Sequence, residues 1–333
     1  MEIFQTTEGD PKQESTQKKT PPLILLDQTT EPEPGPPHEA LFLALAYLPV
    51  FELLAMSEVC VSLRDSVKRD DVLPWLNVVV QRPLDSRLSD QTLMRIASMA
   101  RGRLTTLALV NCSQVTDHGL QCVVEQNPVI EKLFIPGCTG LTPEGVIRAV
   151  KTLSQHGHTL KNLWINGINE IEKHHLETLH SCLQNNMTKQ QKPWPFLLFH
   201  EYRNFSTIRH YKYQPMIDME ICPRCKELRA IFDCASKACK AKMEKSSMLG
   251  CRGCIFCIPR CIECGRCFES VEQEEAVCED CLCLDCWLQL PKCNFCNKPY
   301  CRQHAEEKGC CSLESAGFVC EACKQSQYNS DDE

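Results

Sequence analysis

The uneven distribution of cysteine constrains this chain more than any other feature. The chain has 333 residues and 26 cysteines, and only five of those cysteines lie before residue 222. The other 21 fall between Cys222 and Cys323. This shift in composition predicts a domain boundary near residues 219–222. Clustered cysteines in a reducing compartment suggest metal ligands before disulfides, so the last third of the chain is expected to fold around bound metal.

The first residues and the length of the apolar stretches indicate the cellular compartment that we expect for this chain. Residues 1–20 are polar and charged, with no apolar core followed by a small-residue cleavage site. The longest apolar stretches, such as residues 41–48, are far too short to cross a bilayer as a helix. We therefore expect a protein of the nucleus or cytoplasm, with no membrane partner and with reduced thiols.

Pairs of cysteines separated by two residues dominate the cysteine-rich region. A C-x2-C knuckle places two thiolates on one tight turn, and two knuckles complete a closed tetrahedral zinc site. His304 follows Cys301 at the same spacing, and the adjacent Cys310 and Cys311 are expected to be spare. The pattern predicts about five structural zinc ions. The predicted ligands are Cys222, Cys225, Cys234, Cys239, Cys251, Cys254, Cys257, Cys261, Cys264, Cys267, Cys278, Cys281, Cys283, Cys286, Cys293, Cys296, Cys301, His304, Cys320 and Cys323.

Other chemistries compete with structural zinc. Disulfides are disfavoured without a secretory signal. The run Cys251-x2-Cys254-x2-Cys257-x3-Cys261 has the spacing of bacterial ferredoxins, but Ile262 stands where proline is expected. Catalytic zinc needs an open coordination position, usually with histidine or carboxylate ligands, and His304 is the one well-spaced histidine. Structural zinc is therefore favoured.

The last pairs of ligands allow two arrangements. Four successive pairs can bind two zinc ions consecutively or in a cross-brace, as in RING-like fingers. Cys281 is also an alternative to Cys283 in the first pair. The pairs are Cys283/Cys286, Cys293/Cys296, Cys301/His304 and Cys320/Cys323.

Residues 38–75 have the pattern of a small helical segment. Leu41, Leu45 and Leu48 recur at helical spacing, and Pro49 interrupts them. A second apolar stripe then continues to Val67, which is typical of an amphipathic helix. The segment therefore predicts two or three helices with an apolar face.

A repeat follows. The pattern Leu104-x2-Leu107-x-Leu109-x2-Cys112 recurs 26 residues later, from Ile130 to Cys138. A third copy begins near residue 160, and a degenerate earlier copy surrounds residues 78–93. This self-similarity resembles the cysteine-type leucine-rich repeat.

Each position of the repeat suggests a role. Leu107 and Leu109 alternate on a short strand and should point into the core. Cys112 and its equivalent Cys138 are expected to pack in the core rather than react. Thr116 and Asp117 can cap the helix that follows them. The apolar run at residues 196–199 is expected to form a last strand.

The order of motifs around the helical segment resembles the F-box. The chain contains Tyr47-Leu48-Pro49, Leu53-Leu54, Val59-Cys60, Leu63-Arg64 and Leu73-Pro74-Trp75. It departs from the family pattern where Pro36 replaces an opening leucine, Leu63 replaces a tryptophan and Pro74 splits the final Leu-Trp pair.

With the repeats and a tail that opens MEICPRC at residues 219–225, most of the chain is similar to plant F-box proteins of the Skp-interacting-partner group. In this family the F-box binds a Skp-type adaptor that docks on cullin, and the remainder is taken to recruit a protein substrate. The adaptor-binding residues that the resemblance implies are Pro37, Leu41, Leu45, Leu48, Pro49, Leu53, Leu54, Val59 and Cys60.

The charge and the motifs of the chain argue against nucleic-acid binding and against catalysis. The net charge is −7, and residues 222–333 hold 15 Lys and Arg against 18 Asp and Glu, which argues against a nucleic-acid partner. The chain shows no nucleophile–base constellation and no phosphate-binding glycine loop. We expect a non-catalytic receptor subunit of a ubiquitin ligase. Two alternatives are a ligase that acts directly through a RING-like finger at 278–323, and a zinc-finger scaffold that binds proteins.

The expected fold class is α+β multidomain, with a helical F-box, a short α/β leucine-rich-repeat solenoid and a zinc-stabilised region of little regular structure. The expected organisation is a disordered tail at 1–37, an F-box at 38–75, repeats at 76–200, a linker at 201–219, the cysteine-rich zinc-binding region at 220–325 and a disordered acidic tail at 326–333.

Overall fold

The structure is a computed structural model that describes residues 38–68, 74–155, 160–184, 197–203, 215–239, 241, 250–268, 272–308 and 318–328. The tail expected at 1–37, which includes Pro37, lies outside these residues, as do Cys310 and Cys311. The first residues of the acidic tail expected at 326–333 belong to helix α13 (Glu321–Tyr328), and the rest of that tail lies outside the described residues. Among the described helices, none is long and apolar enough to cross a membrane.

A short helical segment opens the described part, as the apolar spacing predicts. It comprises α1 (Glu39–Ala44), the 3-10 turn η1 (Leu45–Tyr47), α2 (Val50–Val59), α3 (Val61–Lys68) and the 3-10 turn η2 (Pro74–Leu76). His38 caps α1, because its side chain accepts a hydrogen bond from the Ala40 N–H. Six side chains of this segment are buried in the same hydrophobic cluster as the strands that follow: Leu45, Val50, Leu53, Leu63, Val67 and Trp75.

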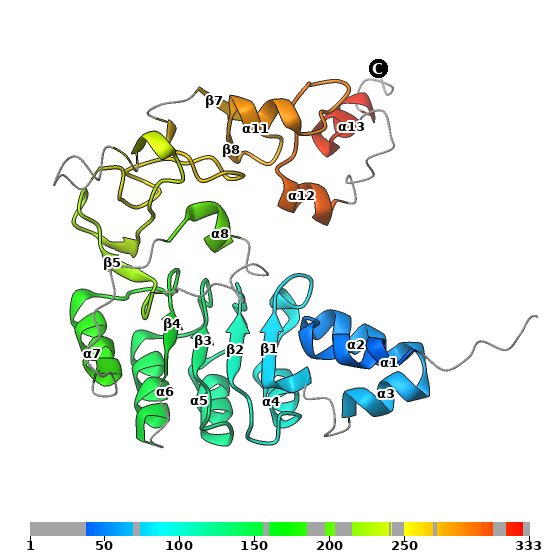
Figure 1. Cartoon of the computed structure of the whole chain (residues 1–333), viewed down its shortest axis with the longest axis vertical. Coiled ribbons are helices and arrows are strands. Elements are labelled where there is room, and N and C mark those ends of the chain that lie inside the picture. Colours follow the sequence, from blue (N-terminus) through cyan, green and yellow to red (C-terminus); the bar gives the residue numbers. More distant parts are fainter. Residues whose placement is uncertain are drawn as a thin grey trace, which may run out of the picture. The chain divides into compact units, whose positions relative to one another are not determined.

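Four strand–helix units come next, and their parallel strands form one sheet in the order β1-β2-β3-β4. Figure 1 shows the four helices on one side of the strands. The register pairs Leu107 with Leu133, and Leu133 with Leu163. Equivalent apolar side chains therefore lie in one row, although the third copy of the repeat follows after 30 residues rather than 26. The units are β1 (Asn77–Val80) with η3 (Asp85–Arg87) and α4 (Asp90–Ser98), β2 (Thr106–Leu109) with α5 (Asp117–Gln126), β3 (Lys132–Phe134) with α6 (Pro143–Gln155), and β4 (Asn162–Trp164) with α7 (Lys173–Gln184).

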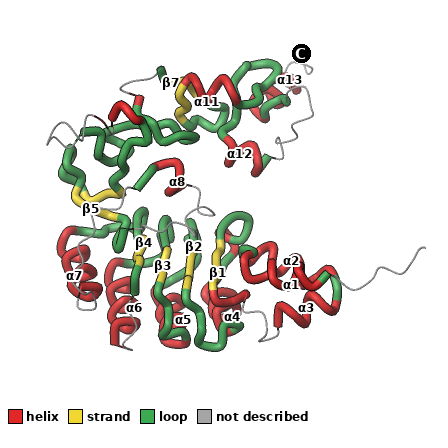
Figure 2. Tube along the Cα trace, in the orientation of Figure 1, coloured by secondary structure: helices red, strands yellow, loops and turns green. Residues whose placement is uncertain are grey.

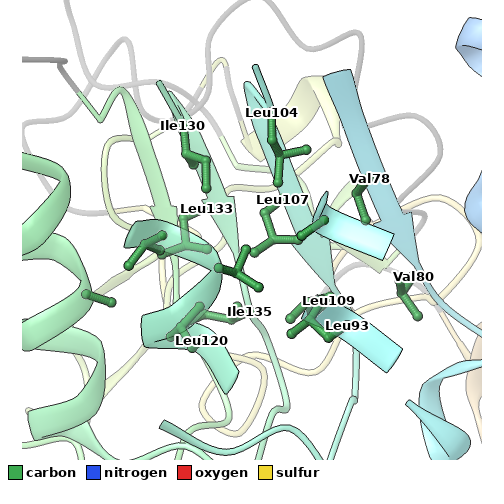
Figure 3. Packing of buried hydrophobic residues seen from close by; sticks show 14 of the residues in the cluster. Val78, Val80, Leu93, Leu104, Leu107, Leu109, Leu120, Ile130, Leu133 and Ile135 are labelled. Carbon is green, nitrogen blue, oxygen red and sulfur yellow. The ribbon is translucent and has the colours of Figure 1, made fainter. Parts of the chain in front are cut away.

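The main apolar core lies between the sheet and its helices. Figure 3 shows Leu107 and Leu133 from neighbouring strands, with Leu120 of α5 among the side chains beside them. All three are fully buried. Cys112 and Cys138 are buried in the same cluster, so the packing role predicted for them is confirmed.

Carboxylates tie each unit to the next. Asp90 accepts hydrogen bonds from the main-chain N–H and the hydroxyl of Thr116, at 2.8 and 2.6 Å. Asp117 accepts the same pair from Thr142, at 2.9 and 2.6 Å. The prediction that Thr116 and Asp117 cap their own helix is therefore wrong. Thr116 does stand at the N-cap of α5 but makes no side-chain cap bond, because its hydroxyl donates to the preceding unit.

Replacement of Asp117 by alanine is expected to lower the free energy of unfolding by about 2 kcal/mol, because two donors of Thr142 lose a charged acceptor. Urea denaturation measures the change. Lys151→Ala, at an exposed position of α6, is the control and should stay within about 0.5 kcal/mol of the parent. Equal urea midpoints for the two variants would show that the hydrogen bonds between Asp117 and Thr142 add nothing to stability.

The other face of the sheet is covered by the chain itself. One side chain from each strand contributes to a second buried cluster, against which Leu197 and Tyr202 pack. The Tyr202 ring stacks on Trp164 with their centroids 4.8 Å apart. The four strand residues of this cluster are Val79, Ala108, Phe134 and Trp164.

The chain that covers this face is helical where a last strand was expected. Leu198 forms only an isolated bridge with Asp233, and Phe199 begins helix α8 (Phe199–Arg203). The strand predicted at 196–199 is therefore wrong in its described residues. The aromatic residues Phe199 and Tyr202 pack against other elements, and this packing outweighs the strand preference of the apolar run.

The linker expected at 201–219 is part of the fold at both ends. Its first residues complete α8, and its last residues reach the edge strand β4. Asp218 accepts hydrogen bonds from the N–H groups of Ile165 and Asn166 and from the Tyr202 hydroxyl, at 2.8, 3.2 and 2.7 Å. Asp218 thus fastens α8 to the end of β4.

The cysteine-rich region has little regular structure, as predicted, and Figure 2 shows mostly loops there. It contains two antiparallel two-stranded sheets and several short helices among its described residues. These elements include β5 (Met219–Ile221), β6 (Leu228–Ala230), β7 (Gln273–Glu275), β8 (Cys281–Cys283), α11 (Leu284–Gln289), α12 (Arg302–Glu307) and α13.

Candidate metal centres

Donor atoms from distant positions converge in five groups of four, each with all donors within 4.8 Å of one another. Four groups contain cysteine alone, and a mixed group contains Cys278, Asp280, Cys301 and His304. Group 1 is Cys222, Cys225, Cys254 and Cys257; group 2 is Cys234, Cys239, Cys251 and Cys267; group 3 is Cys261, Cys264, Cys283 and Cys286; group 4 is Cys293, Cys296, Cys320 and Cys323.

The sulfur separations fit a tetrahedral metal site. Zinc–sulfur bonds of about 2.3 Å at tetrahedral angles place the sulfurs about 3.8 Å apart. In the four all-cysteine groups, the sulfur–sulfur distances are 4.0 Å for Cys222–Cys257, 3.8 Å for Cys239–Cys267, 3.7 Å for Cys264–Cys283 and 3.8 Å for Cys296–Cys320. A disulfide needs about 2.05 Å, and the described cysteines are free thiols. The donor sets therefore fit four-coordinate metal ions.

Three knuckles share one backbone design. The residue after the second cysteine takes a positive φ, of 64° at Lys226, 69° at Gly265 and 55° at Asn297. The N–H of that residue donates to the carbonyl of the first cysteine of its knuckle, at 2.9, 2.9 and 3.0 Å respectively. The turn places the two sulfurs of a knuckle on the same side of the backbone, as the C-x2-C spacing predicts.

The five groups overlap along the chain. Group 1 spans residues 222–257, group 2 spans 234–267, group 3 spans 261–286, the mixed group spans 278–304 and group 4 spans 293–323. Each group begins before the preceding one ends. A metal ion bound in one site would therefore hold a loop that also carries ligands of the next site.

The membership of the groups answers two questions that the sequence left open: whether the ferredoxin-like run surrounds one cluster, and whether the last ligand pairs are consecutive or cross-braced. The ferredoxin-like run is divided among three groups, with Cys251 in group 2, Cys254 and Cys257 in group 1, and Cys261 in group 3, so those four thiols do not meet around one cluster. Within 278–323, ligand pairs alternate between the mixed group and group 4, which is a cross-brace. Its first pair is not Cys283 with Cys286, because these two belong to group 3.

Positively charged side chains lie against the thiols. Arg266 donates to the sulfurs of Cys264 and Cys283, at 3.3 and 3.4 Å. A hydrogen bond from Cys261, with a further one from Arg266, lowers the pKa of Cys264 to about 4. Arg260 is only 1% exposed, and one of its nitrogens lies 3.9 Å from the Cys251 sulfur. Negatively charged metal–thiolate centres would balance these cations, which supports metal binding.

One predicted ligand is replaced. Cys281 lies outside the five groups, and its sulfur accepts a hydrogen bond from Gln273 at 3.0 Å. Asp280 takes its place, 3.1 Å from both Cys301 Sγ and His304 Nδ1. Asp280 has no signal in the sequence, because a single aspartate in an acidic stretch lacks the two-residue spacing that marks the cysteine and histidine pairs. All the other predicted ligands lie in a group.

The helical segment presents a second candidate surface. Leu45 and Leu53 are 0% and 1% exposed and pack in the chain's own core, and contact of these two residues with an adaptor stays a prediction. Leu41, Leu48, Pro49 and Cys60 are half-buried. The large apolar side chains that remain exposed in this segment are Leu43, Tyr47, Phe51, Leu54, Val59 and Val61.

Comparisons with known proteins give a consistent result. The family described as the At3g27290 F-box protein C-terminal domain matches residues 218–295, which hold most of the candidate metal ligands. F-box protein SKIP28 of Arabidopsis thaliana is 41% identical over 307 residues, covering 90% of this chain and 94% of the relative.

Two further Arabidopsis thaliana proteins are similar. F-box protein SKIP14 is 33% identical over 77% of this chain and 55% of the relative. F-box protein At3g27290 is 31% identical over 71% of this chain and 62% of the relative. The similarity to SKIP28 spans nearly the whole of both chains, and it includes the helical segment, the strand–helix units and the cysteine-rich region. The chain therefore belongs to the F-box protein family, in the plant group that includes SKIP28 and SKIP14.

Proposed function

We propose that this chain is the substrate-recognition subunit of an SCF-type cullin ubiquitin ligase. Its family membership supports such an adaptor role in general. Residues 38–75 are the proposed F-box, which binds a Skp-type adaptor and, through it, cullin. In this proposal the chain is non-catalytic, acts in the nucleus or cytoplasm, and binds neither nucleic acid nor membrane.

The observation that supports this role best is the divided apolar surface of α1, α2 and α3. One set of their side chains, including Leu53 and Leu63, anchors the segment in the main core. Another set remains exposed, with Leu43 at 71% and Val59 at 67%. Exposed apolar surface of this extent on a small segment is typical of a protein–protein interface.

The combined change Leu54→Glu and Val59→Glu tests this proposal. Both side chains are exposed at positions of α2, so binding of a Skp-type adaptor should weaken at least about 30-fold, as for interface hot spots, while the melting temperature stays unchanged. Ser62→Glu, which adds one negative charge at an exposed polar position of α3 where the double variant adds two, is the control for added charge. Titration calorimetry with the purified adaptor measures the affinity. Unaltered adaptor binding by the double variant would refute the assignment.

We further propose that the four strand–helix units are leucine-rich repeats and that they recruit a protein target together with the zinc region. The alternation of Leu107 and Leu109 toward the helices, with Ala108 on the opposite face, supports this identity. Solenoids of this kind commonly bind partners on an extended concave surface. Because Tyr202 and Leu197 cover the second sheet face, the target is expected to contact other surfaces, above all the cysteine-rich region.

The proposed cofactor is zinc, about five structural ions. Four sets of four thiolates fit its tetrahedral coordination and its preference for sulfur and nitrogen ligands. The sites are closed by protein ligands, as in structural zinc centres. Zinc in this proposal adds to small apolar clusters in which ligand cysteines pack beside side chains such as Leu282 and Tyr300.

A direct ligase is the second candidate, because the mixed group and group 4 form a cross-brace over 278–323. Phe295, inside the first knuckle of group 4, is 59% exposed and offers an apolar contact to a ubiquitin-conjugating enzyme. Autoubiquitination by the purified chain without cullin or adaptor would favour this candidate. Activity that requires both added components would favour the receptor.

A further inference from the structure

The mixed group differs from the other four in its donor chemistry. We propose that Cys278, Asp280, Cys301 and His304 bind a metal ion with Asp280 as the fourth ligand, and that this site exchanges its metal more readily than the all-cysteine sites. The inference rests on the metal-binding role proposed above and names the residue and the behaviour of one site.

Two structural elements bring these four donors together. Cys301 is fully buried and stands at the N-cap of α12, so His304 lies one turn further along the same helix, with its Nδ1 3.0 Å from Cys301 Sγ. Cys278 lies on the facing loop, and its Sγ accepts a hydrogen bond from the Cys301 N–H at 3.5 Å. The pair Cys301 and His304 therefore faces the pair Cys278 and Asp280, with room for a metal ion between them in this proposal.

A tight turn aims Asp280 at this position. Glu279 has a φ of 62°, and the turn is closed by hydrogen bonds from Glu279 N–H to the Ala276 carbonyl and from Ala276 N–H to the Asp280 carbonyl, both 3.1 Å. Asp280 Oδ2 lies 3.4 Å from Cys278 Sγ. Cys281 is the first residue of β8, and its sulfur instead contacts Gln273 of β7. The turn thus points the Asp280 carboxylate toward the mixed group and the Cys281 thiol away from it.

An arginine from another part of the chain approaches the second oxygen of the carboxylate. Arg203 Nη2 lies 3.9 Å from Asp280 Oδ1, while Oδ2 faces the other three donors. Charged partners of this kind orient a ligating carboxylate. Arg203 ends α8, whose Tyr202 donates to Asp218, so the orientation of Asp280 is tied to the sheet.

The ligand set accounts for readier exchange. Four thiolates around a divalent ion give a net charge of −2, whereas two thiolates, one carboxylate and a neutral imidazole give −1, so the electrostatic attraction for the ion is smaller. Thiolates also suit zinc better than carboxylates, which suit harder ions. The side chains of Asp280 and His304 are 19% and 27% exposed, so water and chelators reach two of the four ligands. Cys225 of group 1 and Cys296 of group 4 are also exposed, so the expected difference in exchange comes from the donor chemistry and not from exposure.

Native mass spectrometry of the full-length zinc-loaded chain during a chelator titration tests the inference. The parent should release one ion at a chelator concentration at least about tenfold below that which removes the rest. Asp280→Ala should carry one ion fewer from the start, and Cys281→Ala, the adjacent control, should match the parent. Asp280→Cys supplies a third thiolate, so it should keep the full number of ions and lose the early release step.

Three outcomes would overturn the inference. They are loss of an ion in Cys281→Ala but not in Asp280→Ala, release of all ions from the parent in one step, and an early release that persists unchanged in Asp280→Cys. A parent that carries no zinc at all would refute the zinc cofactor itself. Adaptor binding, which depends on α1, α2 and α3, is measured separately and distinguishes failure of this inference from failure of the receptor assignment.

Discussion

Removal of metal with a chelator under reducing conditions is expected to unfold the cysteine-rich region while the strand–helix units stay folded. The buried clusters of groups 1 and 2 consist mostly of the ligand cysteines themselves, with Ile231 and Ile258 as their larger apolar members. Coordination therefore supplies most of the folding free energy there. A structural zinc contributes about 10–16 kcal/mol in small zinc-binding peptides, which is comparable with the whole stability of an ordinary domain, about 5–15 kcal/mol.

Amide hydrogen exchange resolved by segment measures this effect. Chelation should abolish protection within 220–323 and leave β2 and β3, in the main core, protected. Cys112→Ala is the control: Cys112 packs in that core and lies outside the metal groups, so this variant should lose stability and retain all its zinc. Protection of the cysteine-rich region that survives complete removal of zinc would contradict the prediction.

Asp218→Ala is expected to lower the free energy of unfolding by about 4 kcal/mol. The change leaves the N–H groups of Ile165 and Asn166 and the hydroxyl of Tyr202 without their acceptor, and each unsatisfied buried donor costs about 1–3 kcal/mol. Tyr202→Phe removes one of these bonds and should lose about 1 kcal/mol. Guanidinium denaturation measures both variants, with Asp65→Ala, at an exposed position of α3, as the control. An Asp218→Ala loss no larger than that of the control would show that Asp218 does not hold α8 on the sheet.

Asp218 also predicts a pH dependence. Burial raises its pKa to about 6 from the usual 3.8, although hydrogen bonds from Ile165 and Tyr202 lower it in part. Since the folded chain binds this proton more tightly than the unfolded chain, stability from this group rises as the pH falls from 7 toward 4. The gain between pH 7 and pH 5 is about 1 kcal/mol.

The difference in stability between the parent and Asp218→Asn, measured at pH 7 and pH 5, isolates this contribution. Other titrating groups are common to both proteins, so their effects cancel. The parent should gain about 1 kcal/mol relative to the variant at the lower pH. A difference that stays constant would show that the carboxyl of Asp218 titrates at its ordinary pKa, and a change in the opposite direction would show that folding lowers its pKa.

Much of the fold follows from local pattern. The 26-residue period, read from Leu107 and Leu133, corresponds to the pairing of these two residues across neighbouring strands, because a repeat of fixed length stacks equivalent positions side by side. The burial of Cys112 follows from its place in that period. The apolar spacing of residues 38–75 likewise predicts helices, but it does not show which apolar residues stay exposed. Leu53 and Leu54 are adjacent in sequence, yet they are 1% and 38% exposed.

The sequence by itself determined that the last third of the chain carries metal-ligand knuckles, because two thiols on one turn depend only on local spacing. The tertiary structure alone decided which knuckles share a site, since partners such as Cys225 and Cys254 are brought together by loops whose path no local pattern encodes. It also decided that Asp280 rather than Cys281 faces Cys301 and His304. A one-residue shift at a turn reverses the direction of a side chain, and only the turn geometry records it.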